Sequence, residues 1–253
     1  MKISFLFIGL FAFFSVNAQL GREERFESFF GFQVKPLFPS SFIGAENHFF
    51  SNQGYNVEIK QKVGYSFGGV VRVALTDFIG IETGINFNQR FYQFNMSIPD
   101  SNISLVDNFG FVQYDIPLNA LFYVKMTKKW YMNAALGPAV GYKPSSVGTI
   151  AQPGGKHEFI NIGLVAINKK INIDLTGNVG FEYRTKKSGI FYLGGSARVP
   201  TSPLFELVSR YRYGSYEVDN YGQIGGSFLS IDLKYFIPNT GGNGQKFNHG
   251  PIE

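Results

Sequence analysis

The sequence predicts an all-β fold, an eight-stranded antiparallel β-barrel that crosses a membrane, and three observations carry this prediction. Apolar and polar residues alternate through segments of about ten residues or more, and successive side chains of a strand face opposite sides of its sheet. The connections between these segments alternate between long and short. The chain also begins with a stretch that has the form of an export signal.

Residues 1–18 are expected to be a signal peptide. A basic start at Lys2 precedes an apolar run, and Ala18 provides a small-residue cleavage site. The run is shorter than the roughly 20 apolar residues that a spanning helix requires, and charges or polar residues interrupt every later apolar run. The barrel is therefore expected at 19–237, followed by a flexible Gly/Asn-rich tail at 238–253.

Composition excludes several classes of protein. The chain has no cysteine, which excludes a disulfide scaffold. Its formal net charge of +5 comes from interleaved basic and acidic residues, whereas a nucleic-acid surface would gather its basic residues in one patch. Mean hydropathy is −0.02, which suits a barrel because alternate residues alone would face lipid.

Eight strands are expected in order along the chain, with apolar residues facing outward and polar residues facing inward. Their ranges are 28–37, 62–75, 78–96, 112–126, 130–142, 171–184, 190–199 and 226–237. Pro117 lies inside the fourth range, and because proline cannot donate to a ladder, a local bulge is expected there. One further apolar segment, 159–167, has no assigned place.

The connections predict how the barrel is oriented. Four are long, at 38–61, 97–111, 143–170 and 200–225, and the three between them are short, near 76–78, 127–129 and 185–189. This alternation places all long connections at one end. Outer-membrane barrels have long extracellular loops and short periplasmic turns, whereas a soluble barrel has less reason to sort them.

The side chains that are expected to face the lumen carry charges of both signs. The basic ones are Lys35, Arg72, Arg90, Lys125, Arg184, Arg198 and Lys234, and the acidic ones are Glu82, Asp115, Asp174, Glu182 and Asp232. Eight strands enclose a space that side chains fill, and buried charges persist there when they are paired. A plug of ion pairs is expected, not an open channel.

Two central segments resemble a known family. They are Y-D-I-P-L-N-A-L-F-Y-V-K at Tyr114–Lys125 and W-Y-M-N-A-A-L-G-P-A-V-G-Y at Trp130–Tyr142. They resemble the small outer-membrane β-barrel proteins of Bacteroidetes-type bacteria, the PorT-like family. The resemblance implies an eight-stranded barrel in the cell outer membrane, in contact with outer-membrane lipid and the barrel-insertion machinery. A few members serve a secretion apparatus. One departure is the tail after Phe236, because such barrels usually end on an aromatic residue of the last strand.

Candidate catalytic chemistry is sparse. The three histidines fall in two predicted loops and the tail, at His48, His157 and His249. None has acidic neighbours at metal-ligand spacing, so neither a metal nor a cofactor is expected. A lipid-modifying site at the rim would need His, Ser and a carboxylate, and His48 beside Glu46 and Ser51, or His157 beside Glu158, offers those residue types. Adjacency alone does not create a catalytic geometry, so no catalytic residue is assigned.

The long connection at 200–225 is rich in tyrosine and arginine, which are favoured at recognition surfaces. Its candidate binding residues are Tyr211, Tyr213, Tyr216 and Tyr221, although aromatic side chains also gather at membrane interfaces. The expected function is that of a non-enzymatic outer-membrane barrel that is envelope-structural or binds an envelope protein or glycan through its loops. The alternatives are a lipid-modifying outer-membrane enzyme and a soluble secreted ligand-binding barrel.

Overall fold

The computed structural model describes residues 28–40, 47–76, 78–185 and 187–238, so the predicted signal peptide and nearly all of the predicted tail lie outside it. Eight strands close into an antiparallel ring, because β1 pairs with both β13 and β3. They are β1 (Ser28–Pro39), β3 (Tyr55–Ala74), β4 (Ile79–Ile98), β5 (Ile103–Lys125), β6 (Trp130–Tyr142), β9 (Ile171–Thr185), β10 (Gly189–Pro200) and β13 (Phe228–Phe236). The predicted eight-stranded antiparallel barrel is confirmed.

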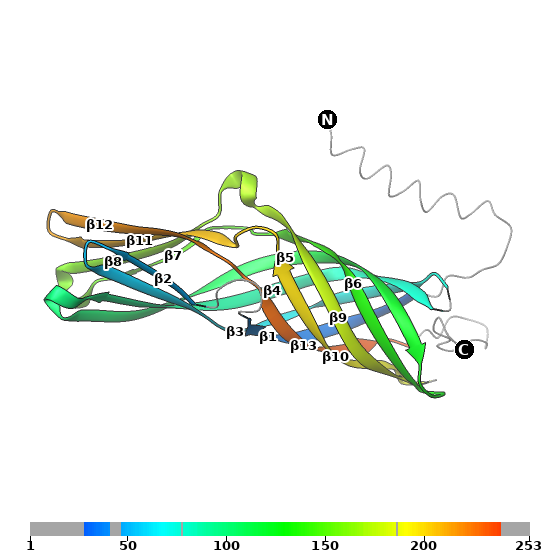
Figure 1. Ribbon diagram of the computed structural model, residues 1–253. Helices are drawn as coiled ribbons and strands as arrows, with labels where there is room; N and C mark the ends of the chain where they lie inside the picture. The colour runs from blue at the N-terminus through cyan, green and yellow to red at the C-terminus, as the bar shows by residue number, and fades with distance from the viewer. Residues whose placement is uncertain (1–27, 41–46, 77, 186, 239–253) are drawn as a thin grey trace.

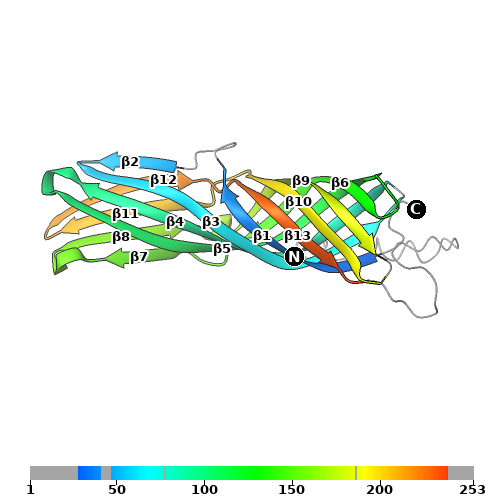
Figure 2. The ribbon, with the colours of Figure 1, turned by 90° about the horizontal axis from the view of Figure 1, so that it is seen from below.

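A second body, which we call the extension, continues from one end of the barrel (Figures 1 and 2). β3, β4 and β5 run on into it, and β2 (Asn47–Asn52) pairs with the first part of β3. Facing them is a four-stranded sheet made of β7 (Val147–Ala151), β8 (His157–Leu164), β11 (Phe205–Tyr213) and β12 (Tyr216–Ile224). None of the helices in the described part of the chain is long and apolar enough to span a membrane.

The four long connections lie at one end, as predicted, but most of their residues form strands. The connection 97–111 consists of the ends of β4 and β5, joined around the short 3-10 turn η1 (Pro99–Ser101). The connections 143–170 and 200–225 contain the β7–β8 and β11–β12 hairpins. The unplaced apolar segment 159–167 covers most of β8 and ends at Ile167, the first residue of η3 (Ile167–Lys169), and β8 pairs with β11.

The two bodies bury opposite kinds of side chain. In the barrel the predicted faces are confirmed: Leu175 and its apolar neighbours point outward and are about half exposed, whereas Asp174 and Glu182 are fully buried inside. In the extension the apolar side chains point inward. They form one core whose members include Tyr55, Val57, Ile59, Tyr92, Phe94, Met96, Phe109, Phe111, Phe159, Phe205, Leu207 and Tyr211.

Strand β3 changes faces through a β-bulge. Lys62 pairs with Phe91 and Tyr65 pairs with Gln89, so two residues of β3 lie opposite Arg90 alone. Apart from Gln61, the odd-numbered residues of β3 are apolar; they face outward in the barrel, and the extra residue turns them inward in the extension. Gly64 is required at this bulge, because a Cβ there would lie 2.2 Å from the Gln89 carbonyl oxygen.

The bulge predicted at Pro117 is absent. Asp115 pairs with Asn86 and Leu118 pairs with Thr83, in one unbroken register. Pro117 has no N–H to donate, but neither strand gains an extra residue at this position. The Pro117 carbonyl accepts a hydrogen bond of 2.7 Å from the Thr83 hydroxyl. The prediction was wrong because a proline removes one donor but does not change the number of residues between pairs.

Aromatic side chains form a row at each end of the apolar outer wall of the barrel. Next to the short turns, the ring of Trp130 lies against that of Tyr183 and the ring of Phe191 against that of Tyr235, with ring centroids 5.1 and 5.2 Å apart. At the other end, beside the bulge, the row consists of Tyr65, Phe67, Phe87, Phe91, Tyr114 and Tyr142. Such paired rows are typical of the two interfaces of a membrane.

Candidate functional site

The lumen nearest the short turns is filled by an ionic cluster around Glu182. This β9 carboxylate binds Arg72 of β3 through one oxygen and Arg184, at 3.0 Å, through the other, and Asn133 of β6 also donates to it. Arg72 also binds Glu82 at 2.7 Å, and Lys234 of β13 binds the second oxygen of Glu82. The guanidinium groups lie over aromatic rings, Arg184 at 3.9 Å from the centre of Tyr131.

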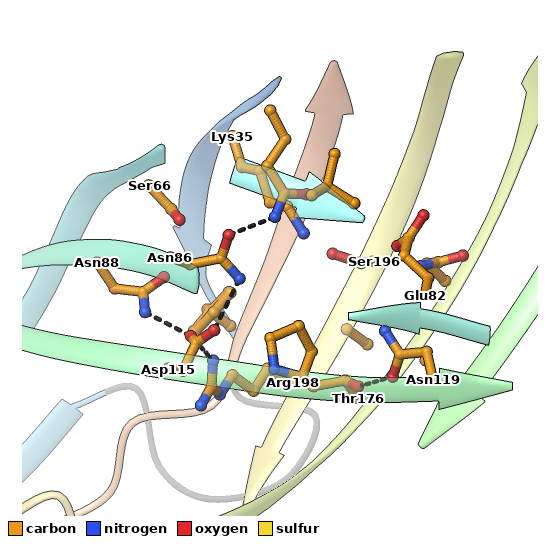
Figure 3. A pocket seen from close by; sticks show the side chains of 17 residues that line it. Lys35, Ser66, Glu82, Asn86, Asn88, Asp115, Asn119, Thr176, Ser196 and Arg198 are labelled. Carbon is orange, nitrogen blue, oxygen red and sulfur yellow. Dashed lines mark hydrogen bonds and ion pairs between the residues drawn. The ribbon is translucent and has the colours of Figure 1, made fainter. Parts of the chain in front are cut away.

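A second ionic cluster lies in the lumen closer to the extension and surrounds Asp115 (Figure 3). Arg198 of β10 joins Asp115 of β5 to Asp174 of β9, with 2.6 Å between Arg198 Nε and Asp174. The amides of Asn86 and Asn88 donate to the two Asp115 oxygens. Each charge is therefore paired and hydrogen-bonded, which offsets the cost of removing it from water.

The space that remains inside the barrel is small. Between the two clusters lies a polar cavity of about 40 Å³, lined by residues that include Glu82, Asn119, Asn178 and Ser196 (Figure 3). This is room for about three water molecules, at roughly 10–15 Å³ for each. The lumen is thus packed with side chains, as predicted.

The predicted set of lumen charges needs two qualifications. Lys125 lies at the short-turn end and is exposed to solvent. Arg90 is fully buried, and among the described residues no carboxylate lies within ion-pair distance of it. It donates instead to the Gly226 carbonyl at 2.7 Å and the Gln113 side chain at 3.1 Å, and its guanidinium lies 4.8 Å from the Phe228 ring. Sequence reasoning could not find these partners, because Gly226 and Phe228 are more than 130 residues from Arg90 in the chain and the contact with Gln113 depends on the register of β4 against β5.

A closed lumen predicts an electrical result. The purified protein in planar bilayers is expected to show no stable large conductance, because ionic clusters span an eight-stranded barrel whose free volume is a few water molecules. The measurement is single-channel current at both polarities, with a large porin as the positive control. A steady porin-like conductance would contradict the closed-lumen interpretation.

At the far tip of the extension, side chains from three hairpins surround a second cavity, of about 220 Å³. Its lining, which we call the tip pocket, consists of Gln53, Tyr55, Ile98, Asp100, Ser101, Tyr211, Tyr213 and Tyr216. Tyr55 and Tyr211 are buried in its floor with ring centroids 5.8 Å apart, and Tyr213 and Tyr216 remain nearly half exposed. The pocket is concave, aromatic and carries one carboxylate, a combination found in ligand sites.

The hydroxyl groups in the pocket floor are held by hydrogen bonds. Tyr55 is 2.7 Å from the Ser209 hydroxyl, and Tyr211 is 2.7 Å from Nδ1 of His157. Burial raises the pKa of both phenols, so they stay protonated. Hence the floor is preorganised, while the rings of Tyr213 and Tyr216 and the Asp100 carboxylate form its accessible wall.

The structure brings together three of the four tyrosines that the sequence singled out. Tyr211, Tyr213 and Tyr216 line the tip pocket, whereas Tyr221 is not part of its lining, is 65% exposed and donates a hydrogen bond to Asp219. The sequence did not indicate the pocket residues of the other two hairpins, which are Gln53, Tyr55, Ile98, Asp100 and Ser101. They reach the pocket because the two sheets of the extension pack face to face around a shared core, which brings together residues more than a hundred positions apart in the chain.

The histidines considered for catalysis lie in structural contacts. Nδ1 of His157 shares a hydrogen bond with the Tyr211 hydroxyl, and the His157 ring stacks on that of Tyr213 with ring centroids 4.5 Å apart. His48 lies in β2 and its ring is parallel to that of Phe50. Glu158 binds Arg212 at 3.0 Å. Glu46 and His249 fall outside the described residues, and within the described ones no cluster of His, Asp or Glu has the form of a metal site.

An apolar outer wall with aromatic rows at both ends, around a packed polar lumen, defines an integral membrane β-barrel. The model of the outer membrane protein beta-barrel domain family matches residues 17–205, and the chain belongs to this family. The protein is therefore located in the outer membrane, with the extension outside the cell and the short turns in the periplasm. The PorT-like subtype stays a prediction.

Solved structures similar to this chain include two barrels. The solution structure of Outer Membrane Protein W from E. coli is 15% identical, with 85% of this chain and 99% of that chain covered and a TM-score of 0.34. The beta domain of the Bordetella autotransporter BrkA is 10% identical, with 82% and 98% covered and a TM-score of 0.28. Comparison with curated proteins finds no match.

Proposed function

We propose that this outer-membrane barrel is a non-enzymatic receptor that holds a glycan in the tip pocket of its extension. The tip pocket carries the proposal. Sugar rings present C–H faces that stack on aromatic rings and hydroxyls that pair with carboxylates and amides, and Tyr213, Tyr216, Asp100 and Gln53 offer those groups. A volume of about 220 Å³ is below the roughly 300–1,000 Å³ of sites for drug-sized ligands, so it suits a single sugar unit.

Two further features support a binding role over a transport or catalytic one. The packed lumen leaves no room for a solute to pass. The nitrogen of His157 that faces the pocket floor is engaged by Tyr211, so this histidine is placed as a support for the floor rather than beside a serine nucleophile. Outer-membrane lipid and the barrel-insertion machinery are the other partners that we propose from the location. A protein of the envelope or of a secretion apparatus is the alternative occupant of the tip.

The tip pocket is tested by removing its exposed rings. A Tyr213→Ala, Tyr216→Ala double variant is expected to lose at least tenfold in affinity for glycans that bind the detergent-solubilised protein on an array, since each ring contributes stacking worth about 1 kcal/mol. The matched control is Tyr221→Ala, which removes a more exposed tyrosine of the same hairpin outside the pocket.

Affinity for any bound glycan that is equal in the double variant and the parent would contradict the assignment of the site. If no glycan binds, the glycan proposal fails. A photoreactive residue at position 216, cross-linked in living cells, then shows whether a protein occupies the tip. A cross-link that the Tyr213→Ala change abolishes would favour the envelope-protein alternative.

A further inference from the structure

A short turn projects sideways from the wall of the molecule where the extension meets the barrel. It consists of η3 (Ile167–Lys169) with Lys170 and Ile171, and it stands clear of the strands between β8 and β9 (Figure 1). Ile167 is 88% exposed, more than any other large apolar side chain among the described residues. An isoleucine that is this exposed on a projecting turn indicates contact with an apolar environment outside the chain.

The height of this turn relative to the bilayer follows from strand pairing. Ile171, the first residue of β9, pairs with Tyr142 of β6, which pairs with Tyr114 of β5. Tyr114 and Tyr142 belong to the extracellular aromatic row, and Ile171 is itself 67% exposed on the lipid-facing side. The turn therefore lies just beyond the aromatic row, at the level of the lipid headgroups of the outer leaflet.

The turn also carries two lysines beside its isoleucines. Lys169 binds Glu206 at 2.5 Å, but both side chains are about half exposed, and such a surface pair is worth at most about 1 kcal/mol. Lys170 donates to the Pro144 carbonyl at 3.2 Å. Two lysines flanked by isoleucines at headgroup level are the composition of an interfacial anchor, in which lysines bind lipid phosphates above buried apolar side chains.

We propose that residues 167–171 are a docking finger for the outer leaflet. Ile167 and Ile171 insert at the boundary between acyl chains and headgroups, and Lys169 and Lys170 bind the phosphate groups of an anionic outer-leaflet lipid. The occupant is lipid because the finger is continuous with the lipid-facing row of β9, which is Ile171, Ile173, Leu175, Val179 and Phe181. The finger limits tilting of the barrel and sets the height of the extension above the membrane.

The absence of cysteine allows a single probe to be placed beside Ile167. We would introduce Asn168→Cys, label it with an environment-sensitive fluorophore and place the protein in nanodiscs of phosphatidylcholine with added lipid A. The label is expected to emit at shorter wavelength and to be protected from iodide. The control site is Ser104→Cys, an exposed position on β5 in the extension, where the label should stay accessible.

Two changes in the Asn168→Cys background separate the apolar and the ionic contributions. Ile167→Ser is expected to abolish protection in both lipid mixtures. Lys169→Glu with Lys170→Glu should reduce protection where lipid A is present more than in phosphatidylcholine alone. Lys60→Glu, which changes a partly exposed lysine of β3 in the extension, should leave protection unchanged in both lipid mixtures.

Three results would overturn the proposal. The first is iodide quenching of the label at 168 equal to that at 104, which would mean that the finger stays in water. The second is protection that persists after Ile167→Ser. The third is protection that appears only when two proteins share a nanodisc, which would assign the finger to contact between copies.

Discussion

Inserting one alanine between Ile59 and Lys60 is expected to unfold the extension while the barrel below it stays closed. If the bulge of β3 is kept, Tyr55, Val57 and Ile59 turn away from the core, because a shift of one residue exchanges the faces of a strand. If the strand slides to keep them inside, Lys60 and Lys62 enter the core. Losing the burial of three large side chains costs roughly 5–9 kcal/mol, at about 1.5–3 kcal/mol for each.

The measurement is limited proteolysis of the detergent-solubilised protein, with the heat-dependent gel mobility of the closed barrel recorded in parallel. Rapid cleavage in the extension with unchanged mobility is the expected pattern. Deletion of Val63 is the matched control, because it removes the bulge and leaves a regular ladder with both faces of β3 retained. Resistance of the insertion variant equal to that of the parent would show that the bulge does not set the faces of β3.

Replacing Glu182 by glutamine is expected to lower the free energy of unfolding by about 3–5 kcal/mol. The change removes the carboxylate that pairs with Arg72 and Arg184, and Arg184 then has no acidic partner among the described residues. A buried charge without a partner carries its full cost of desolvation. Urea unfolding in lipid vesicles, followed by the fluorescence of the single tryptophan, Trp130, measures the change.

Two controls make the Glu182 result specific. Glu58→Gln breaks the Glu58–Lys60 pair of 2.9 Å, whose side chains are about one-third exposed, and should cost less than about 1 kcal/mol. Adding Arg184→Met to Glu182→Gln removes the unpaired cation and should recover part of the lost stability. A loss from Glu182→Gln no larger than that from Glu58→Gln would show that the lumen hydrates its charges and is not dry and packed.

The faces of the barrel strands could be read from the sequence because alternation is a local property. Leu175 and Asp174 differ in polarity and are neighbours in the chain, and a strand sends neighbours to opposite sides whatever its partners are. The alternation of long and short connections likewise shows which end of the barrel carries the large extracellular part. Neither inference needs to know which strands pair.

The extension could not be predicted in the same way. An alternating segment such as 55–61 has the same pattern whether its apolar face meets lipid or a protein core. In β4 and β5 the apolar residues move from one set of alternate positions to the other where the strands enter the extension. In β3 they stay at the odd-numbered positions, and the bulge opposite Arg90 turns those positions from the outer face to the core. That choice depends on the neighbouring strands, and β3 pairs with β1 below the bulge and with β2 above it.

The sequence by itself determined the barrel strands and their faces, the charged lumen and a tyrosine-rich segment outside the membrane. It also predicts the export signal. Tertiary structure alone decided which charges meet, as when Arg198 of β10 joins Asp115 to Asp174, and which tyrosines share a pocket with Asp100. The physical reason is that hydrophobic alternation is a property of each segment. Ion pairs depend instead on strand register between segments that are far apart in the chain, and closure of the ring sets that register. The tip pocket depends on the packing of the two separate sheets of the extension against each other.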